Sequence, residues 1–498
     1  MTDLSATVIA RRELPDPERH RVLWTIAALT ATALLVPATW LAYGALAVAV
    51  LVSVLYGSIC VLEGKVGTLM LAWVLLSPLG YYFLSIPRER PFWNFDRSLV
   101  LLLAVSACFA LPATSIRMPE PLRHAGLAWS VFLLACGLSL LKISGRLPLL
   151  SGVRVLLDGF LLPPLLAWCV IVCVQVREQL RLLHFLICVV VIGLAAIGLA
   201  ELTSGKDLLA IPGAGLYYAG SSESLLLRVN GPFSSNNSFG LIGLVLFCFL
   251  LFLRKAEMFL PGWQRVLHWI GVSSALAVSL MPLFRSIFLT LLLIALLDVW
   301  FTQGLRRRIF RVVTLLVMGV IFLLGNAILP DLYQERVSSG ENVYARMAQQ
   351  RQTLRLFLRN PLLGVGLNNF IAAVPKDTPY VGPYSGVDPL DAPHSNLGAV
   401  LAETGILGFI PYVLANGFLV AAFWKARRRD SPSFVLVWKY FLYIFLSYWV
   451  SGVSLTSGHY GDLNLWYLLT IAVLYKYGAT DESGYPGTTL RFRAQSSL

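Results

Sequence analysis

Residues 391–408 read DAPHSNLGAVLAETGILG, and they mark the point where a polar arm ends and an apolar block begins. The arm covers residues 330–395. Apolar segments long enough to cross about 30 Å of hydrocarbon flank it on both sides. We therefore expect the arm at a membrane surface, with His394 just before the chain enters the lipid.

The composition is that of a membrane protein. Hydrophobic residues make up 57% of the chain and charged residues 13%, and the mean hydropathy is +0.73. At about 20 residues per span, the apolar blocks predict an all-α polytopic membrane protein of about fourteen transmembrane helices, with a large periplasmic loop containing amphipathic helices before the twelfth span. The expected spans are residues 22–39, 42–62, 67–85, 98–116, 127–143, 155–175, 182–201, 236–254, 267–283, 286–302, 311–329, 396–423, 434–452 and 463–477.

The pattern of loops and tails divides the chain into segments. We expect a cytoplasmic N-terminal tail at residues 1–21, helix bundles at 22–329 and 396–477, the periplasmic loop at 330–395, and a cytoplasmic C-terminal tail at 478–498. The N-terminal segment is too long and too acidic for the charged region of a signal peptide, and no cleavage site follows it, so we expect it to remain.

Basic clusters at alternate loops mark the expected cytoplasmic face. They are Arg11, Arg12 and Arg21; Arg177 and Arg181; Arg254, Lys255 and Arg265; Arg306, Arg307, Arg308 and Arg311; and Lys425, Arg427, Arg428 and Arg429. The loop with Arg88, Arg90 and Arg97 departs from this rule. The same distribution explains the net charge of +13 without a nucleic-acid partner, which would need one contiguous basic surface.

The cysteine pattern predicts neither a disulfide framework nor a metal centre. All seven cysteines fall inside apolar blocks, where thiols usually pack as small hydrophobic groups. Cys169 and Cys173 are one helical turn apart, but no histidine or carboxylate accompanies them at a spacing typical of metal ligands. We expect no metal and no cofactor.

Two of the six histidines, His394 and His459, lie on the expected outer face. We favour a loop role for His459, although a second site residue is the alternative. A lone histidine at a helix start is more often a capping or interfacial group than a catalyst. For His394 the neighbours favour function, because a carboxylate inside the apolar run needs a partner or a role and paired glycines allow close approach. The supporting residues are Ser395 and Asn396, which can cap a helix, and Glu403, Gly405 and Gly408.

Arginines supply the second half of the candidate site. Arg285 stands between two apolar blocks, where it must meet an anion or reach the interface. In the arm, the stretch YARMAQQRQTLRLFLRNP, residues 344–361, predicts an amphipathic helix with an apolar stripe of Val343, Met347, Leu354 and Leu358. At about 100° per residue, Arg346 points roughly 140 to 220° away from Arg351, Arg355 and Arg359. We expect those three to face headgroups or solvent, and Arg346 to be the site candidate.

These residues resemble the O-antigen ligase and polymerase superfamily of bacterial envelope glycosyltransferases. The histidine element of that superfamily, a histidine followed by Asn, Ser or Gln, nine residues and Gly-x-x-Gly, is matched by His394, Ser395, Gly405 and Gly408. ARMAQQRQTLRLFLRNPLLGVGLNNF, RVNGPFSSNNSFG and PLFRSIF are similar to further elements. The resemblance covers roughly residues 225 to 425. Gln350 departs from the aromatic residue or leucine that is common at its position.

The resemblance implies a multi-pass inverting glycosyltransferase of the bacterial inner membrane, with an active site facing the periplasm. Its donor would be an undecaprenyl-diphosphate-linked oligosaccharide, and its acceptor a glycan or glycolipid hydroxyl, without nucleotide sugar or metal. His394 would activate the acceptor, and Arg285 and Arg346 would hold the diphosphate. Arg228 is a third candidate clamp, for which a structural loop role is equally open. Membrane lipids and a chain-length regulator are further candidate partners.

Polysaccharide polymerisation is our preferred interpretation within this superfamily, and ligation to lipid A core or protein is the first alternative. A lipid-linked glycan transporter or flippase is the second, because such proteins also carry interrupted helices and intramembrane charges. The sequence DGFLLPPLLAW, with Asp158, Pro163 and Pro164, could form such an interruption. An imidazole with an ordinary pKa of about 6.5 can accept a proton at neutral pH, and fixed arginines can stabilise a departing diphosphate.

Overall fold

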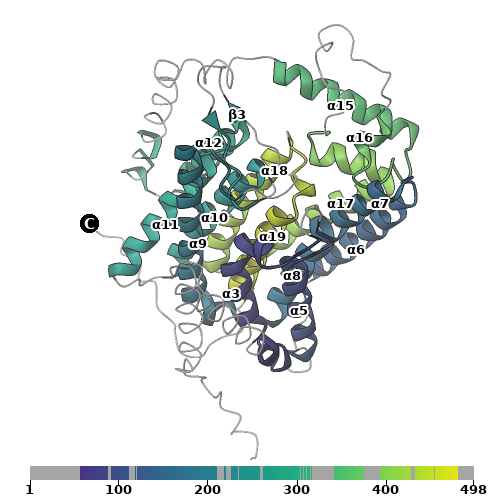
Figure 1. Cartoon of the computed structure of the whole chain (residues 1–498). Helices are drawn as coiled ribbons and strands as arrows, with labels where there is room; N and C mark the ends of the chain where they lie inside the picture. Colours follow the sequence, from purple (N-terminus) through teal and green to yellow (C-terminus); the bar gives the residue numbers. More distant parts are fainter. Residues whose placement is uncertain are drawn as a thin grey trace, which may run out of the picture.

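The computed structural model of the chain is a helix bundle with two short β-hairpins (Figure 1). It describes residues 57–87, 91–110, 118, 120–209, 218–219, 226–233, 235–257, 262–302, 304–306, 308–309, 311–313, 316, 341–374, 393–427, 432–453 and 455–479. The expected spans 22–39 and 311–329, most of 42–62, and both tails lie largely or wholly outside these residues.

The elements of the first half begin near the expected spans. They are α3 (Val66–Leu76), η1 (Ser77–Leu79), α4 (Gly80–Phe83), β1 (Ser85–Ile86), β2 (Trp93–Asn94), α5 (Phe95–Ala110), α6 (Glu120–Leu140), α7 (Arg146–Arg154), η3 (Val155–Leu161), α8 (Leu162–Cys173) and α9 (Val176–Ser204). Pro78 interrupts the first of these blocks, since proline removes a backbone donor.

The second half contains two short strands and the helices that carry or adjoin the candidate residues. They are β3 (Tyr218–Ala219), β4 (Leu226–Leu227), α10 (Asn236–Ala256), α11 (Gly262–Leu280), α12 (Arg285–Phe301), α15 (Glu341–Arg359), α16 (Phe370–Ala373), α17 (Asn396–Arg427), α18 (Pro432–Gly452), η6 (Ser457–His459) and α19 (Gly461–Ala479). The strands pair as antiparallel hairpins, Ser85 with Asn94 and Tyr218 with Leu227, which the all-α prediction did not include.

Six of the described helical segments are long and apolar enough to cross a membrane. They are Glu120–Leu140, Arg146–Cys173, Val176–Ser204, Asn236–Ala256, Asn396–Arg427 and Ser433–Gly452. These segments agree with an all-α multi-pass membrane protein.

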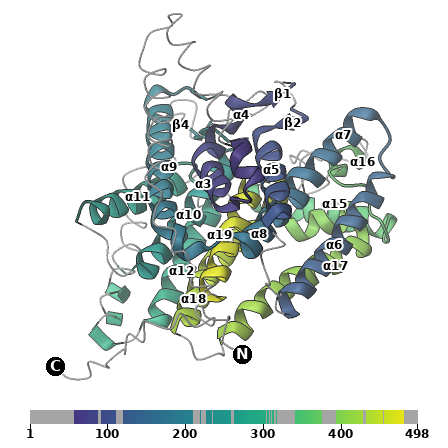
Figure 2. The same ribbon diagram turned by 90° about the horizontal axis from the view of Figure 1, so that it is seen from below.

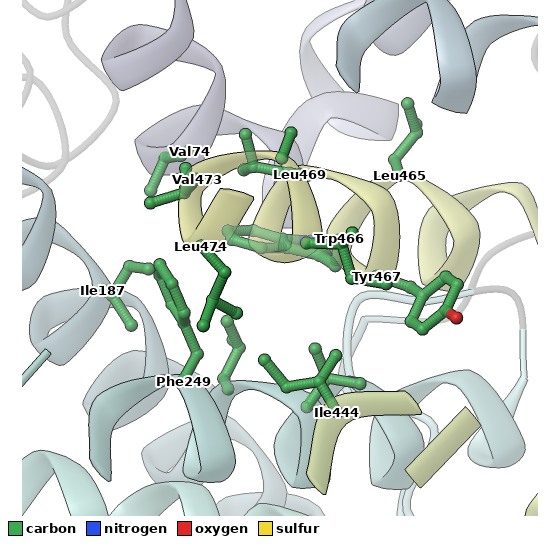
Figure 3. Packing of buried hydrophobic residues seen from close by; sticks show 14 of the residues in the cluster. Val74, Ile187, Phe249, Ile444, Leu465, Trp466, Tyr467, Leu469, Val473 and Leu474 are labelled. Atoms are coloured by element: carbon green, nitrogen blue, oxygen red, sulfur yellow. The ribbon is translucent and has the colours of Figure 1, made fainter. Parts of the chain in front are cut away.

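The packed centre of the bundle is built around α10 and α19. Side chains of α19 such as Trp466 and Leu474 meet Val74 of α3, Ile187 of α9 and Phe249 of α10 (Figure 3). Beside this centre, α6 and α17 run next to each other (Figure 2), and α15 packs on α17. Figure 1 shows α15 and β3 at the same end of the bundle.

An ion pair accounts for Arg97, one of the three arginines in the loop that departs from the charge rule; Arg88 and Arg90 lie outside the described residues. Arg97 is only 2% exposed, and its Nε and Nη2 atoms donate to the two carboxylate oxygens of Asp158 at 2.7 and 2.8 Å. Asp158 lies in the π-helical turn η3. Arg97 is therefore held inside the bundle by a bidentate partner, and it carries no information on which face its loop occupies.

Candidate functional site

The site is organised by a break in α17 at Gly405. The backbone there has φ 64° and ψ −164°, which leaves carbonyl and N–H groups on either side without their usual helical partners. The loop after α15, residues 361–366 (PLLGVG), supplies partners instead. Four backbone hydrogen bonds join the two segments: Val365 N–H to Ala402 O at 2.9 Å, Gly366 N–H to Glu403 O at 3.0 Å, Ile406 N–H to Pro361 O at 2.8 Å, and Leu407 N–H to Leu362 O at 3.2 Å.

Glycines make this close contact possible on both sides. A Cβ atom on Gly405 would lie 2.3 Å from the carbonyl oxygen of Leu362, and one on Gly364 would lie 2.3 Å from the carbonyl carbon of Glu403. Both glycines also have positive φ, 64° and 67°, a region that residues with a Cβ rarely adopt. The glycines of two separate sequence elements are thus required by one backbone junction.

Glu403, directly before the break, is 1% exposed and is a second point of attachment. Its Oε2 atom accepts a hydrogen bond from the backbone N–H of Asn368 at 2.9 Å. The same Oε2 lies 3.1 Å from Nε2 of His459. The interpretation of His459 as a loop group without a site role is therefore incomplete, because its ring lies against this buried carboxylate.

His394 directly precedes two polar residues, Ser395 and Asn396, that anchor the start of α17. His394 is half-buried, with a positive φ of 48°. The Ser395 hydroxyl accepts from the Gly398 N–H at 3.2 Å, which is the predicted cap. The amide oxygen of Asn396 instead accepts from the Gly458 N–H at 2.7 Å. The loop that carries His459 is therefore fixed to the helix start that carries His394.

Helix α15 presents one face to α17 and the opposite face outward. Gln349 and Thr353 are buried, and a Cβ atom on Gly398 would lie 3.2 Å from Cγ2 of Thr353. Arg346, two turns before Thr353, shares that face and is half-buried. The exposed side chains of the helix include Arg351, Arg355 and Arg359, together with Met347, Leu354 and Leu358. The separation of Arg346 from the other three arginines follows the helical periodicity of the sequence.

Arg228 and the turn before Arg285 form a second group. The guanidinium carbon of Arg228 lies 5.9 Å from the centroid of the Phe284 ring, and Arg285, which is exposed, opens α12. This turn packs on α10, since a Cβ atom on Gly240 would lie 3.1 Å from Cγ of Pro282. The two arginine elements therefore meet at the start of α10.

The loop of residues 455–462 connects the arginine group with the histidine group. Asn237 donates from its side-chain amide to the Tyr460 hydroxyl at 3.1 Å, and the Ser238 hydroxyl donates to Asp462 Oδ1 at 2.9 Å. On its other side the loop reaches Asn396 and Glu403 as described above. The loop therefore contacts the start of α10, which follows Arg228 in the chain, and the start of α17, which follows His394.

Comparison with known families identifies one match over the middle of the chain. The family model described as O-antigen ligase matches residues 224–413, and this match supports the O-antigen ligase and polymerase superfamily. The matched region includes Arg228, Arg285, Arg346 and His394, whereas His459 follows it. A search of curated proteins gave no match.

Proposed function

We propose that this member of the O-antigen ligase and polymerase superfamily polymerises polysaccharide repeat units at the periplasmic face of the bacterial inner membrane. The donor is an undecaprenyl-diphosphate-linked oligosaccharide, and the acceptor is a sugar hydroxyl of a second lipid-linked unit. The observation that supports the proposal is the attachment of two loops to α17, the helix that follows His394. The loop after α15 binds at the Gly405 break, and the loop before α19 binds at Asn396.

In this proposal His394 is the general base. The acceptor oxygen forms a bond to the anomeric carbon of the donor sugar on the face opposite the diphosphate, so the configuration inverts. His394 takes the hydroxyl proton, and the bond between the anomeric carbon and the diphosphate oxygen breaks with its electron pair on the diphosphate. The step balances without metal or nucleotide sugar.

The reaction also requires stabilisation of the negative charge that develops on the diphosphate. We assign this stabilisation to Arg285 and Arg346, with Arg228 as a third clamp, because guanidinium groups donate paired hydrogen bonds to diphosphate oxygens. The half-buried position of Arg346 on the α15 face that packs against α17 supports this role. Fixed donors of this kind stabilise a transition state without reorganising.

Glu403 and His459 have a positioning role in the proposal. The carboxylate fixes the backbone of Asn368 and orients the ring of His459. Through Asn396 and the Gly458 N–H, that loop also limits the position of the first turn of α17. Gly405 and Gly408 allow the packing, and Ser395 caps the helix.

An assay of the full-length protein in nanodiscs tests the function. Purified undecaprenyl-diphosphate-linked oligosaccharide is supplied alone or with lipid A core, and products are separated by size. Polymer from the donor alone supports the proposal, whereas transfer that requires the core would assign the protein as a ligase. Movement of the donor across vesicle membranes without any new glycosidic bond would assign the protein as a flippase and not as an enzyme.

A further inference from the structure

Two segments on the expected outer side of the membrane carry only positive charge. Residues 141–154, the turn after α6 and helix α7, contain Lys142, Arg146 and Arg154, and residues 342–374 contain four arginines. Neither segment contains an Asp or a Glu. On this side of a membrane, Lys and Arg have no role in orienting the chain. A surface with this charge attracts an anionic partner.

Hydrogen bonds join the two segments. The side-chain amide of Asn368 donates to the Ser151 hydroxyl at 2.8 Å, and the Leu367 N–H donates to the Ser139 hydroxyl at 3.2 Å. A Cβ atom on Gly152 would lie 2.7 Å from the carbonyl oxygen of Leu367. Both views show α7, α15 and α16 close together (Figures 1 and 2). The end of α6 and helix α7 therefore pack on the loop that directly follows α15.

Large apolar side chains are exposed on both segments. Leu141 is 82% exposed, Leu147 on α7 is 65% exposed, and Leu358 on α15 is 66% exposed. Lys142 and Arg146, which lie between the first two leucines in the chain, are exposed as well. A water-soluble anion would leave these leucines in water, whereas a lipid surface covers them. The mixture of exposed cations and leucines thus favours a membrane surface as the partner.

The outward side of α15 has the arrangement of a helix that lies in a membrane surface. Met347, Leu354 and Leu358 are exposed and fall within roughly 40° of one another at about 100° per residue. The exposed Arg355 and Arg359 begin roughly 60° further around the helix. An apolar strip and a basic strip therefore run side by side. In such helices the apolar side chains enter the hydrocarbon boundary and the guanidinium groups stay among the headgroups.

We propose that the surface formed by residues 141–150 and the outward side of α15 binds the headgroups of anionic phospholipids in the adjoining leaflet. The exposed leucines enter the hydrocarbon boundary, and the cations Lys142, Arg146, Arg355 and Arg359 pair with lipid phosphates. The other side of α15 packs on α17, so the helix is held between α17 and the lipid. The inference goes beyond the proposed function and does not depend on it.

Site-specific photo-crosslinking tests which lipid contacts α15. Leu358 is replaced by benzoylphenylalanine in the full-length protein, in nanodiscs of equal parts phosphatidylglycerol and phosphatidylcholine with the same acyl chains, and the captured lipids are identified by mass. We expect phosphatidylglycerol to be captured roughly fivefold or more over phosphatidylcholine, the effect of about one cation at an anionic headgroup. Added salt should lower this ratio. Equal capture of the two lipids at low salt would overturn the proposal.

A pair of double variants shows whether these arginines cause the preference. Arg355→Gln with Arg359→Gln should bring the capture ratio close to unity. Lys255→Gln with Arg265→Gln removes the same charge from exposed positions on the expected cytoplasmic side and should leave the ratio unchanged. An equal decrease in both double variants would show that the total charge of the protein sets the preference, which would overturn the proposal.

The contribution of α7 is measured in the same nanodiscs. Benzoylphenylalanine in place of Leu147 should also capture phosphatidylglycerol preferentially, and Lys142→Gln with Arg146→Gln should remove that preference. An unchanged ratio in this double variant would remove residues 141–150 from the surface and overturn the proposal in this form.

An acidic glycan is the competing partner, and galacturonic acid oligomers are the probe for it. Binding of the oligomer that is lost in Arg355→Gln with Arg359→Gln, together with equal capture of the two lipids, would assign the surface to a glycan and overturn the lipid proposal. Lipid capture is measured without any glycan donor. A protein that forms no glycosidic bond can therefore still confirm the lipid surface, and an active transferase can still contradict it.

Discussion

The Oε2 atom of Glu403 lies 3.1 Å from the Nε2 atom of His459, although the two residues belong to different helical segments. The carboxylate is 1% exposed, and burial of a charge is costly unless it is paired. The pairing joins the break in α17 to the loop before α19. Glu403 therefore contacts both the loop after α15 and the loop before α19.

Replacement of Glu403 tests this role. Glu403→Gln keeps an oxygen that can accept from the Asn368 N–H but removes the charge beside His459. We expect the rate of glycan transfer to fall roughly tenfold and its pH profile to change, because the imidazole of His459 loses its carboxylate partner. Steady-state rates across pH measure both effects. Glu120→Gln at the exposed start of α6 is the control, and an equal loss there would argue against a specific role.

The backbone junction predicts a steep difference between two glycines of one helix. Gly405→Ala forces a Cβ into the Leu362 carbonyl at positive φ, whereas Gly417 has no atom within 4 Å of its Cβ position. We expect Gly405→Ala to destabilise the protein by roughly 2–6 kcal/mol, and Gly417→Ala to be close to neutral. Thermal unfolding in detergent micelles gives the comparison, and similar midpoints for the two variants would contradict the junction.

The two sides of α15 predict different outcomes for two arginines. Arg346→Ala should lower glycan transfer about 10²–10³-fold, the usual effect of removing one donor from a developing oxyanion. Arg355→Ala, on the exposed side, should leave the rate within about twofold, since exposed charges contribute little. Initial rates at saturating donor give both values. A larger loss in Arg355→Ala than in Arg346→Ala would reverse the assignment of the two faces.

The buried pair of Arg97 and Asp158 predicts a strong coupling. Replacing Asp158 should cost roughly 3–5 kcal/mol, because the Arg97 guanidinium remains buried. The double replacement Arg97→Met with Asp158→Leu should recover a large part of that loss. Unfolding midpoints of the single and double variants complete the cycle, and additive losses would mean that the pair does not act as a unit.

The helices that place the site follow from sequence patterns, because apolar blocks of spanning length have no other stable arrangement in lipid. Helical periodicity was also sufficient to place Arg346 on a different face of α15 from Arg351, Arg355 and Arg359. Spans and helix faces can both be predicted because they depend on residues close together in the chain. The sequence alone could not explain why the loop with Arg97 departs from the charge rule, because the pairing of Arg97 with Asp158 depends on two helices meeting.

The junction at Gly405 could not be predicted from side-chain patterns. It is made by backbone groups of residues 361–366 and 402–407, and any residue type carries such groups. The only indication of the junction in the sequence was indirect, namely the glycines Gly364 and Gly405 in two separate segments. The contact of His459 could not be predicted for a similar reason, because a polar loop histidine is common and its distance to Glu403 exists only in the folded chain.

The most direct test of the central claim is glycan transfer by His394→Ala in nanodiscs, measured with purified undecaprenyl-diphosphate-linked oligosaccharide. His124→Ala on α6, whose ring packs against Phe418, is the control for folding and insertion. The account predicts that His394→Ala inserts and unfolds like the unmodified protein but forms no glycosidic bond, while His124→Ala remains active. Full transfer by His394→Ala would contradict it.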